Sequence, residues 1–326
     1  MALLEVQNLQ THFRTPRGIN RAVNGVSFQV KAGETLAIVG ESGCGKSVTS
    51  MSIMRLLPPG MAKSAGRIIF DGRDLLTLSE KEMERVRGND IGMIFQEPMT
   101  SLNPVLTVGF QIQETIALHQ RVPRSELKRR ALEMLDLVGI PDPSRRLQEY
   151  AHQLSGGMRQ RIMIALALAC KPKLLIADEP TTALDVTIQA QILDLLRQIQ
   201  REQGTAIIFI THDLGVVAES TDRVAVMYAG RIIEEAATST LLANPRHPYT
   251  QGLLAAVPRI GASQRARLAE IPGLVPDLRK KLEGCAFANR CAYASDMCRK
   301  LEPALTQKAP GHWAACHLVE LEGGPA

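Results

Sequence analysis

A glycine-rich stretch near the N-terminus has the composition needed to bind phosphate groups. It reads Gly40-Glu41-Ser42-Gly43-Cys44-Gly45-Lys46-Ser47 and is followed by Val48. Glycines let backbone N–H groups turn inward around phosphate oxygens, and the N-terminus of a following helix adds a positive dipole end. Lys46 would reach the β and γ phosphates of a nucleoside triphosphate, and the Ser47 hydroxyl would bind Mg²⁺. A glycine-rich turn without a ligand is disfavoured, because a predicted strand precedes the stretch and a predicted helix over residues 48–57 follows it.

A second group of chemically useful residues follows an apolar run later in the chain. Residues 174–177 read Leu-Leu-Ile-Ala and are followed by Asp178 and Glu179. A strand here would deliver Asp178 to the carboxyl edge of a sheet, where its carboxylate can bind Mg²⁺. Glu179 would then be placed to orient or deprotonate an attacking water. Two adjacent carboxylates can also cap a helix, but this is the weaker account in a chain with a phosphate-binding loop.

The elements that would position these residues are predicted strands with helical patterns between several of them, as in an α/β domain. Apolar runs without alternation predict strands covered on both faces, and hence a mostly parallel sheet. Apolar positions within residues 3–9 and 23–30 predict a small antiparallel sheet before the phosphate-binding loop. The predicted strands of the parallel sheet lie at residues 36–39, 91–95, 174–177, 206–210 and 224–227.

Helical periodicity is clearest in two stretches. Apolar residues recur at helical spacing over residues 127–138, which Gly139 ends, and over residues 188–199, which Gly204 ends. Ser79 and Glu82 form a capping-box pattern that predicts the start of another short helix. These stripes are ordinary core faces and carry no chemistry of their own.

Bulk properties exclude several classes of protein. The chain has 326 residues, with 45% hydrophobic and 22% charged residues, which predicts a compact, water-soluble fold. Its net charge of +5 comes from 38 basic and 33 acidic residues spread along the chain, so nucleic-acid binding is not implied. The longest apolar run, residues 162–170, is about half the length needed to cross a bilayer, and the N-terminus lacks the pattern of a signal peptide.

One further motif distinguishes between the families that share a phosphate-binding loop. Leu154-Ser155-Gly156-Gly157-Met158-Arg159-Gln160-Arg161 resembles the signature sequence of ABC ATPases, although Met158 replaces the usual glutamine. The resemblance implies that Ser155, Gly156 and Gly157, at the start of a helix, contact the phosphates held by another subunit. It therefore implies a head-to-tail dimer with ATP sandwiched at the interface.

The same resemblance assigns roles to four other residues. Phe13 lies where the family has an aromatic side chain that stacks on adenine. Gln96 resembles the Q-loop glutamine, which joins the Mg²⁺ site to the membrane partner. Asp185, in Ala183-Leu184-Asp185, resembles the D-loop, and His212 resembles the switch histidine that contacts the γ phosphate. Read singly, Phe13 is equally a half-buried strand residue and His212 a surface residue.

The fold implied is an ABC ATPase core over residues 1–257 and an extension over residues 258–326. The core would hold the mostly parallel sheet, the antiparallel N-terminal β subdomain and a helical signature subdomain at about residues 97–165. Prolines punctuate the chain from Pro258 onward, and the boundary is placed there.

Residues 96–104, residues 246–250 and the cysteine-bearing tail resemble the ATPase subunits of bacterial dipeptide and oligopeptide importers. The resemblance implies two transmembrane permease subunits, a second, related but different ATPase subunit, and an extracytoplasmic solute-binding protein as partners. It places the chain peripherally on the cytoplasmic face of the inner membrane. Nickel or another small solute is the alternative cargo. A soluble ABC ATPase acting on DNA or ribosomes, and a non-enzymatic scaffold, are the other readings.

Cysteines crowd the tail of the chain. In a large chain without a secretion signal, such crowding favours metal ligation over disulfides. Four thiolates match the ligand demand of a [4Fe–4S] cluster or a structural Zn²⁺, although the close Cys-x2-Cys spacing of many zinc sites is absent. The resemblance to importer subunits favours the iron–sulfur cluster. Unligated thiols are the third reading. The four residues concerned are Cys285, Cys291, Cys298 and Cys316.

Overall fold

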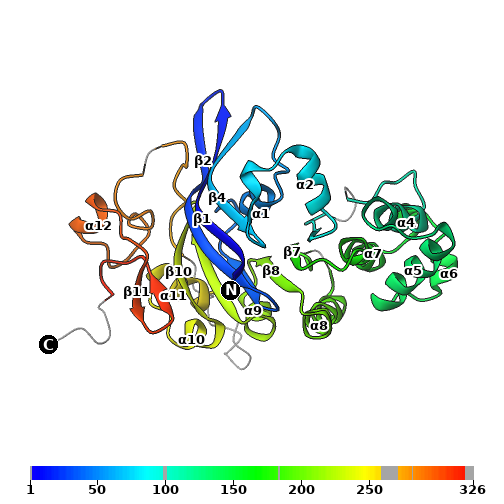
Figure 1. Cartoon of the computed structure of the whole chain (residues 1–326). Helices are drawn as coiled ribbons and strands as arrows, with labels where there is room; N and C mark the ends of the chain where they lie inside the picture. Colours follow the sequence, from blue (N-terminus) through cyan, green and yellow to red (C-terminus); the bar gives the residue numbers. More distant parts are fainter. Residues whose placement is uncertain (1, 98–100, 183, 258–270, 281, 320–326) are drawn as a thin grey trace. The chain divides into compact units, whose positions relative to one another are not determined.

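The computed structural model describes residues 2–97, 101–182, 184–257, 271–280 and 282–319 (Figure 1). The chain divides into two compact units that interleave along the sequence. The first unit comprises residues 1–3, 30–34 and 77–210, and the second comprises residues 4–29, 35–76 and 211–326. The predicted domain boundary at Pro258 lies outside the described residues and stays a prediction.

The first unit contains three parallel strands whose residues are almost entirely buried. β7 lies between β6 and β8, with Ile94 opposite Ala177 and Ala177 opposite Phe209. This arrangement confirms three of the predicted strands, since apolar runs without alternation suit strands covered on both faces. The strands are β6 (Ile91–Ile94), β7 (Leu174–Asp178) and β8 (Ala206–Thr211).

Two helices of the first unit, α2 and α8, show the start and end signals that the sequence predicts. The capping box of α2 is present, with Glu82 N–H donating to Ser79 Oγ at 3.4 Å and Ser79 N–H donating to Glu82 Oε2 at 2.8 Å. Gly204 ends α8 in the left-handed conformation, with φ of 66°. Helices α4, α5 and α7 pack against one another. The helices are α2 (Glu80–Val86), α4 (Val108–His119), α5 (Arg124–Leu137), α6 (Pro143–Arg146), α7 (Gly156–Leu168) and α8 (Val186–Gln203).

The second unit contains the predicted antiparallel sheet, which has the strand order β2-β1-β4-β5. Leu4 lies opposite Phe70 in the pairing of β1 with β4, and both side chains are fully buried. The two predicted stretches therefore recruit a third and a fourth strand from the residues after the phosphate-binding loop. The strands are β1 (Ala2–Thr15), β2 (Gly18–Lys31), β4 (Ala62–Phe70) and β5 (Arg73–Asp74).

The second unit also contains a mixed sheet. β3 pairs with β9 in parallel, and β10, β12 and β11 then continue the sheet in antiparallel fashion. Its strands are β3 (Thr35–Val39), β9 (Arg223–Tyr228), β10 (Arg231–Ala237), β11 (Thr306–Ala309) and β12 (His312–Ala314). Its helices are α1 (Lys46–Ile53), α9 (Leu214–Ser220), α10 (Thr238–Ala243), α11 (Pro248–Ala255) and α12 (Asp296–Lys300).

Helix α1 is shorter than the prediction of residues 48–57. It begins at Lys46, directly at the phosphate-binding loop, and ends at Ile53. Arg55 takes a left-handed conformation with φ of 50°, which an α-helix does not continue through. Among the described residues, no helix is both long and apolar enough to cross a membrane.

The C-terminal extension packs into the core of the second unit. β12 pairs with β10, and Phe287 lies 5.3 Å from Tyr228 and 5.4 Å from Tyr249 between ring centroids. All three rings are buried, and aromatic pairs at such distances add packing energy beyond the area they bury. The extension and the strands beside the phosphate-binding loop therefore share one hydrophobic core.

Candidate functional site

The phosphate-binding loop follows a fully buried strand and opens a helix. β3 ends at Val39, and Gly45 caps the N-terminus of α1 with a left-handed φ of 110°. Glycine is required at two points because a Cβ on Gly40 would lie 2.2 Å from the carbonyl oxygen of Met227, and one on Gly45 would lie 2.3 Å from that of Ala22. The backbones of β9 and β2 therefore leave no room for a side chain at Gly40 or Gly45.

Lys46 is the first residue of α1 and is 5% exposed. Its Nζ donates to the carbonyl oxygens of Gly40 at 2.7 Å and Glu41 at 3.0 Å, and lies 3.8 Å from Cys44 Sγ. None of these three partners is a carboxylate, so none of them competes as a counter-ion with an anionic ligand. Burial raises the pKa of the Cys44 thiol, which suits a packing role within the loop. Ser47 and Val48 follow at half-buried positions.

Glu41 has partners that sequence reasoning missed. Its N–H donates to the hydroxyl of Tyr249 at 2.9 Å, and its carboxylate pairs with the guanidinium of Arg290 at 2.6 Å. Tyr249 lies within residues 246–250, which resemble importer subunits, so the sequence did draw attention to this segment. No sequence pattern pointed to Arg290, which lies 249 positions after Glu41.

Two other predicted residues lie in the second unit. His212 is exposed and follows the last residue of β8, and Asp213 caps the next helix by accepting from the N–H of Gly215 at 2.8 Å. Phe13 is half-buried on β1, opposite Ala62 of β4. Neither position establishes a contact with a nucleotide, so both roles stay predictions.

The acidic pair lies in the first unit, at the carboxyl end of β7. Asp178 is 4% exposed and is the last residue of the strand. Glu179 has a left-handed φ of 49°, and its N–H donates to the carbonyl of Ile210 at 2.9 Å. A left-handed conformation is costly for a residue other than glycine and recurs at functional sites. It turns the chain sharply after β7.

Gln96 and Glu179 meet in the structure. Gln96 Nε2 donates to Glu179 Oε2 at 3.0 Å, and Thr182 Oγ1 donates to the same oxygen, also at 3.0 Å. The structure thus brings together two of the three predicted catalytic residues, and it adds Thr182, which the sequence did not single out. The carboxylate is oriented by two neutral donors, which suits a group that has to accept a proton or a water hydrogen.

The signature residues open helix α7. Ser155 is its N-cap and accepts from the N–H of Met158 at 3.4 Å, while Ser155 and Gly156 are exposed. A Cβ on Gly157 would lie 3.2 Å from Cγ2 of Ile188, so α8 approaches closely there. The exposed N-terminus of α7 is a favourable position for an anion.

Gln160 connects the signature helix with the segment that follows the acidic pair. Gln160 is buried in α7, and its Nε2 donates to the carbonyl of Pro180 at 2.5 Å, one residue after Glu179. Asp185 is exposed and caps α8 by accepting from the N–H of Ile188 at 2.9 Å. The capping role of Asp185 is therefore present, and its predicted role at a dimer interface stays a prediction.

The prediction of a metal cluster in the tail is wrong. All four tail cysteines are among the described residues, and no group of three or more Cys, His, Asp or Glu side chains there is arranged so that it could hold a metal ion. Burial raises the pKa of the thiols of Cys285 and Cys316, which favours the protonated form over the thiolate that ligates metals. Cys298 Sγ lies 3.3 Å from Ser295 Oγ, and all the cysteines are free thiols. The sequence shows that four possible ligands are present, but it does not show where their sulfur atoms lie in space.

Oxygen donors suit the Mg²⁺ that accompanies a nucleoside triphosphate. Mg²⁺ is held in such sites by one or two protein oxygens, phosphate oxygens and water, and does not need a cage of protein ligands. The buried carboxylate of Asp178 and the hydroxyl of Ser47 are donors of this kind. A glycine-rich loop that ends in Lys46 and Ser47, between a buried strand and a helix, is typical of P-loop nucleoside triphosphatases.

The family is established by comparison with known proteins. The family model "ABC transporter" matches residues 23–182, and "Oligopeptide/dipeptide transporter, C-terminal region" matches residues 233–298. A probable peptide ABC transporter ATP-binding protein of Sinorhizobium fredii is 60% identical, covering 96% of this chain and 94% of that protein. The dipeptide transport ATP-binding protein DppD of Escherichia coli is 52% identical, covering 97% of each. The chain belongs to the ABC transporter family of ATP-binding proteins and is an ATPase.

Solved structures agree with this assignment. The chain is similar to a dimeric post-hydrolysis state of an ATP-binding cassette bound to ADP and Pi, with a TM-score of 0.66 and 30% sequence identity. The match covers 72% of this chain and 98% of that one. The α/β ABC ATPase fold with its parallel and antiparallel sheets is confirmed.

Proposed function

We propose that the chain is the ATP-hydrolysing subunit of an importer that takes up dipeptides or oligopeptides. The observation that carries the peptide cargo is the match of residues 233–298 to the oligopeptide/dipeptide transporter C-terminal region. Relatives named for peptide transport align over nearly the whole chain, at 52% to 60% identity. The matched region covers the end of the core and the first part of the extension.

The phosphate-binding loop holds the triphosphate in this proposal. Its backbone N–H groups surround the phosphates, and Lys46 moves from the carbonyls of Gly40 and Glu41 to the β and γ phosphates. Ser47, Asp178 and Gln96 would supply oxygen ligands to Mg²⁺. Mg²⁺, when bound with ATP, neutralises charge that develops on the phosphate oxygens. Phe13 stacks on the adenine.

Hydrolysis depends on Glu179 in this proposal. Gln96 and Thr182 each donate to Oε2 of Glu179 at 3.0 Å, which orients the carboxylate. The carboxylate of Glu179 then accepts a hydrogen of the attacking water. His212 contacts the γ phosphate and reports its loss. Catalysis of this type is largely positioning, so the two neutral donors matter as much as the base itself.

A second subunit completes the site in this proposal. Ser155, Gly156 and Gly157 present the exposed start of α7 to phosphates held by the partner, and Asp185 lies at the same interface. ATP would then bind the closed dimer more tightly than the open one, and its hydrolysis would release the closure. A 100-fold preference corresponds to about 2.7 kcal/mol per nucleotide, which is enough to shift a conformational equilibrium.

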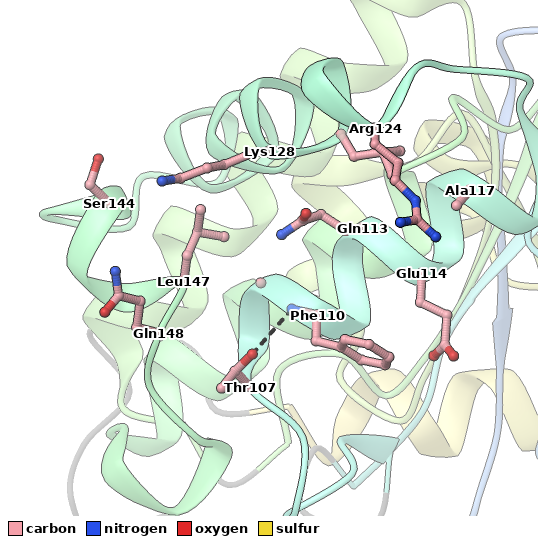
Figure 2. A pocket seen from close by; sticks show the side chains of 12 residues that line it. Thr107, Phe110, Gln113, Glu114, Ala117, Arg124, Lys128, Ser144, Leu147 and Gln148 are labelled. Atoms are coloured by element: carbon pink, nitrogen blue, oxygen red, sulfur yellow. Dashed lines mark hydrogen bonds between the residues drawn. The ribbon is translucent and has the colours of Figure 1, made fainter.

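A hollow on the helical part of the first unit is the surface that we assign to a permease subunit. Its volume is about 680 Å³, and it lies between α4, α5 and the segment after α6 (Figure 2). Phe110 on α4 is 50% exposed at this hollow, an unusual position for a large aromatic side chain. Glu114 on α4 and Lys128 on α5 provide charges of both signs. A short amphipathic helix of a permease fits such a surface.

The assignment is tested in a reconstituted transporter. The chain is expressed with its two permease subunits, its partner ATPase and the solute-binding protein, and ATP turnover is measured in proteoliposomes with di- and oligopeptides or with nickel. Stimulation by peptides is expected. Stimulation of ATP turnover by nickel and not by peptides would contradict the proposed peptide cargo.

The docking surface is tested by Phe110→Asp. This variant should lose co-purification with the permease subunits while the isolated chain keeps its affinity for MgATP. Leu118→Asp, at an exposed position later on α4 that is not part of the hollow, serves as the matched control. Retained co-purification of Phe110→Asp would remove the hollow from the permease interface.

A further inference from the structure

Arg290 of the C-terminal extension forms a two-pronged ion pair with Glu41, the second residue of the phosphate-binding loop. Nη1 lies 2.6 Å from Oε2, and Nη2 lies 2.9 Å from Oε1. The side chain of Arg290 is 5% exposed and that of Glu41 is 27% exposed. A bidentate pair between a guanidinium and a carboxylate fixes both the distance and the plane of the two groups.

The remaining hydrogen-bonding capacity of the guanidinium is also used. Nε donates to the carbonyl of Pro272 at 2.9 Å, Nη2 donates to the carbonyl of Ile271 at 3.1 Å, and Nη1 donates to the hydroxyl of Tyr228 at 3.4 Å. The guanidinium carbon lies 5.8 Å from the ring centre of Tyr228 and 5.9 Å from that of Phe287. A buried charge held on every side cannot move without breaking several contacts together, so Glu41 is tied to a rigid anchor.

A hydrogen bond from the same unit holds the backbone of Glu41. Its N–H donates to Tyr249 Oη at 2.9 Å, and Tyr249 is fully buried at the start of α11. His247 caps α11 by accepting from the N–H of Tyr249 at 3.0 Å, and its own N–H donates to Glu234 at 3.0 Å. His312 of the extension contacts the same carboxylate of Glu234 at 2.7 Å. The backbone and the side chain of Glu41 are therefore both anchored in contacts that lead to the extension.

The contacts of Glu41 with Arg290 and Tyr249 hold the part of the loop that contacts Lys46. The carbonyl oxygens of Gly40 and Glu41 accept from Nζ of Lys46, so the direction of these peptide groups sets where the ammonium lies. An anchored Glu41 keeps this part of the loop in one conformation before ATP arrives, which reduces the ordering cost of binding.

Arg290 also acts through charge. An unpaired carboxylate in the second position of the loop would repel a triphosphate, since like charges oppose each other strongly where water is partly excluded. The guanidinium of Arg290 cancels this charge at a distance of 2.6 Å. Anchoring and neutralisation both favour nucleotide binding.

We propose that Arg290 is a positioning residue for the phosphate-binding loop, and that through it the C-terminal extension sets the affinity of the chain for MgATP. The inference deepens the proposed nucleotide site and rests on the phosphate-binding role of Lys46. It gives the extension a role in the ATPase itself, through a residue between Cys285 and Cys291 that no sequence motif marks.

The test is a double-mutant cycle on the full-length chain. The dissociation constant of MgATP is measured by titration calorimetry for the wild type, Arg290→Met, Glu41→Gln and the double variant, with thermal unfolding as a check that each is folded. Arg290→Met should weaken binding by between about 2-fold and about 30-fold, the range for residues that act on a ligand without touching it. In the Glu41→Gln background, the same substitution should have a clearly smaller effect, because no carboxylate then needs to be neutralised.

A purely structural role predicts a different result. If Arg290 only held the extension in place, Arg290→Met would weaken binding equally in both backgrounds, and the inference would be overturned. If Arg290→Met does not fold, Arg290→Lys and Glu41→Gln are compared in its place. Arg290→Lys keeps the positive charge and Glu41→Gln removes the negative one, but both lose the bidentate ion pair that anchors the loop, so each should weaken binding by at least about twofold. Wild-type affinity in both of these variants would overturn the inference.

The matched control is Glu302→Gln, which breaks another ion pair of the extension, with Arg231 of β10, and leaves the pair of Arg290 and Glu41 intact. Its affinity for MgATP should equal that of the wild type, and a loss equal to that of Arg290→Met would overturn the assignment to Arg290. Lys46→Ala separates the two proposals. If Lys46→Ala still binds MgATP normally, the nucleotide site itself is misassigned. If Lys46→Ala fails to bind and Arg290→Met binds normally, only the present inference fails.

Discussion

Gln96 Nε2 donates a hydrogen bond to Glu179 Oε2 at 3.0 Å, although the two residues are 83 positions apart. Gln96 follows the carboxyl end of β6 and Glu179 follows that of β7, and these strands are parallel neighbours. Parallel neighbours end at one edge of a sheet, so residues that follow them meet there. The carboxylate at the centre of the proposed mechanism is thus oriented by the strand next to its own.

Glu179→Gln should keep MgATP binding and lower the rate of hydrolysis by about 100-fold to 10,000-fold, the usual contribution of a general base. The amide keeps the shape of the side chain but cannot accept a proton. Single-turnover hydrolysis in the assembled transporter measures the effect, with the exposed Glu202→Gln on α8 as control. Near-normal turnover of Glu179→Gln would remove Glu179 from its role.

Lys46→Ala should weaken MgATP binding by about 10-fold to 150-fold, as expected for the loss of a charge-assisted hydrogen bond of about 1.5–3 kcal/mol. Equilibrium titration of the full-length chain measures the change. Lys63→Ala, which removes an exposed lysine from β4, provides the comparison for loss of charge alone. Equal affinities for wild type and Lys46→Ala would contradict the phosphate assignment.

Two glycine substitutions should separate stability from function. Gly40→Ala puts a Cβ 2.2 Å from the carbonyl oxygen of Met227, so it should destabilise the fold by about 1–3 kcal/mol and weaken nucleotide binding. Gly156→Ala meets no atom within 4 Å and lies in the first turn of α7, so the thermal unfolding temperature should not fall. Gly156→Ala should nevertheless lower ATP turnover of the assembled transporter, because the added methyl group covers the proposed phosphate contact. Full turnover of Gly156→Ala would count against the composite site.

Stability should depend on pH through His247. Burial lowers the pKa of this imidazole from 6.5 to about 4, so the folded chain keeps it neutral where the unfolded chain protonates it. The unfolded state therefore takes up the extra proton, and the contribution of His247 to stability is present above pH 6.5 and is lost as the pH falls toward 4.

The loss should reach at most about 3 kcal/mol. Denaturant unfolding at pH 7 and pH 5 measures it, and His247→Gln should show a smaller loss of unfolding free energy between these pH values than the wild type. The exposed His152→Gln should behave like the wild type. An unchanged pH dependence of His247→Gln would show that other groups cause it.

Much of the fold could be predicted because its causes are local. The buried runs of β3, β6, β7, β8 and β9 were visible as apolar stretches, and the capping box of Ser79 and Glu82 needs only residues three apart. The glycines of the phosphate-binding loop were recognisable for the same reason. The end of α1 at Ile53 was missed, because the left-handed turn at Arg55 has no marker in its residue type.

By itself, the sequence determined which chemical groups this protein has and which short segments hold them, since glycine conformations, helix caps and apolar runs act over a few residues. The family followed from the same motifs. Tertiary structure alone decided which distant groups meet, because a contact between residues such as Glu41 and Arg290 depends on how strands and loops from remote parts of the chain pack. It also decided against a metal site in the tail, because ligation depends on where sulfur atoms lie in space and their spacing along the chain does not fix that.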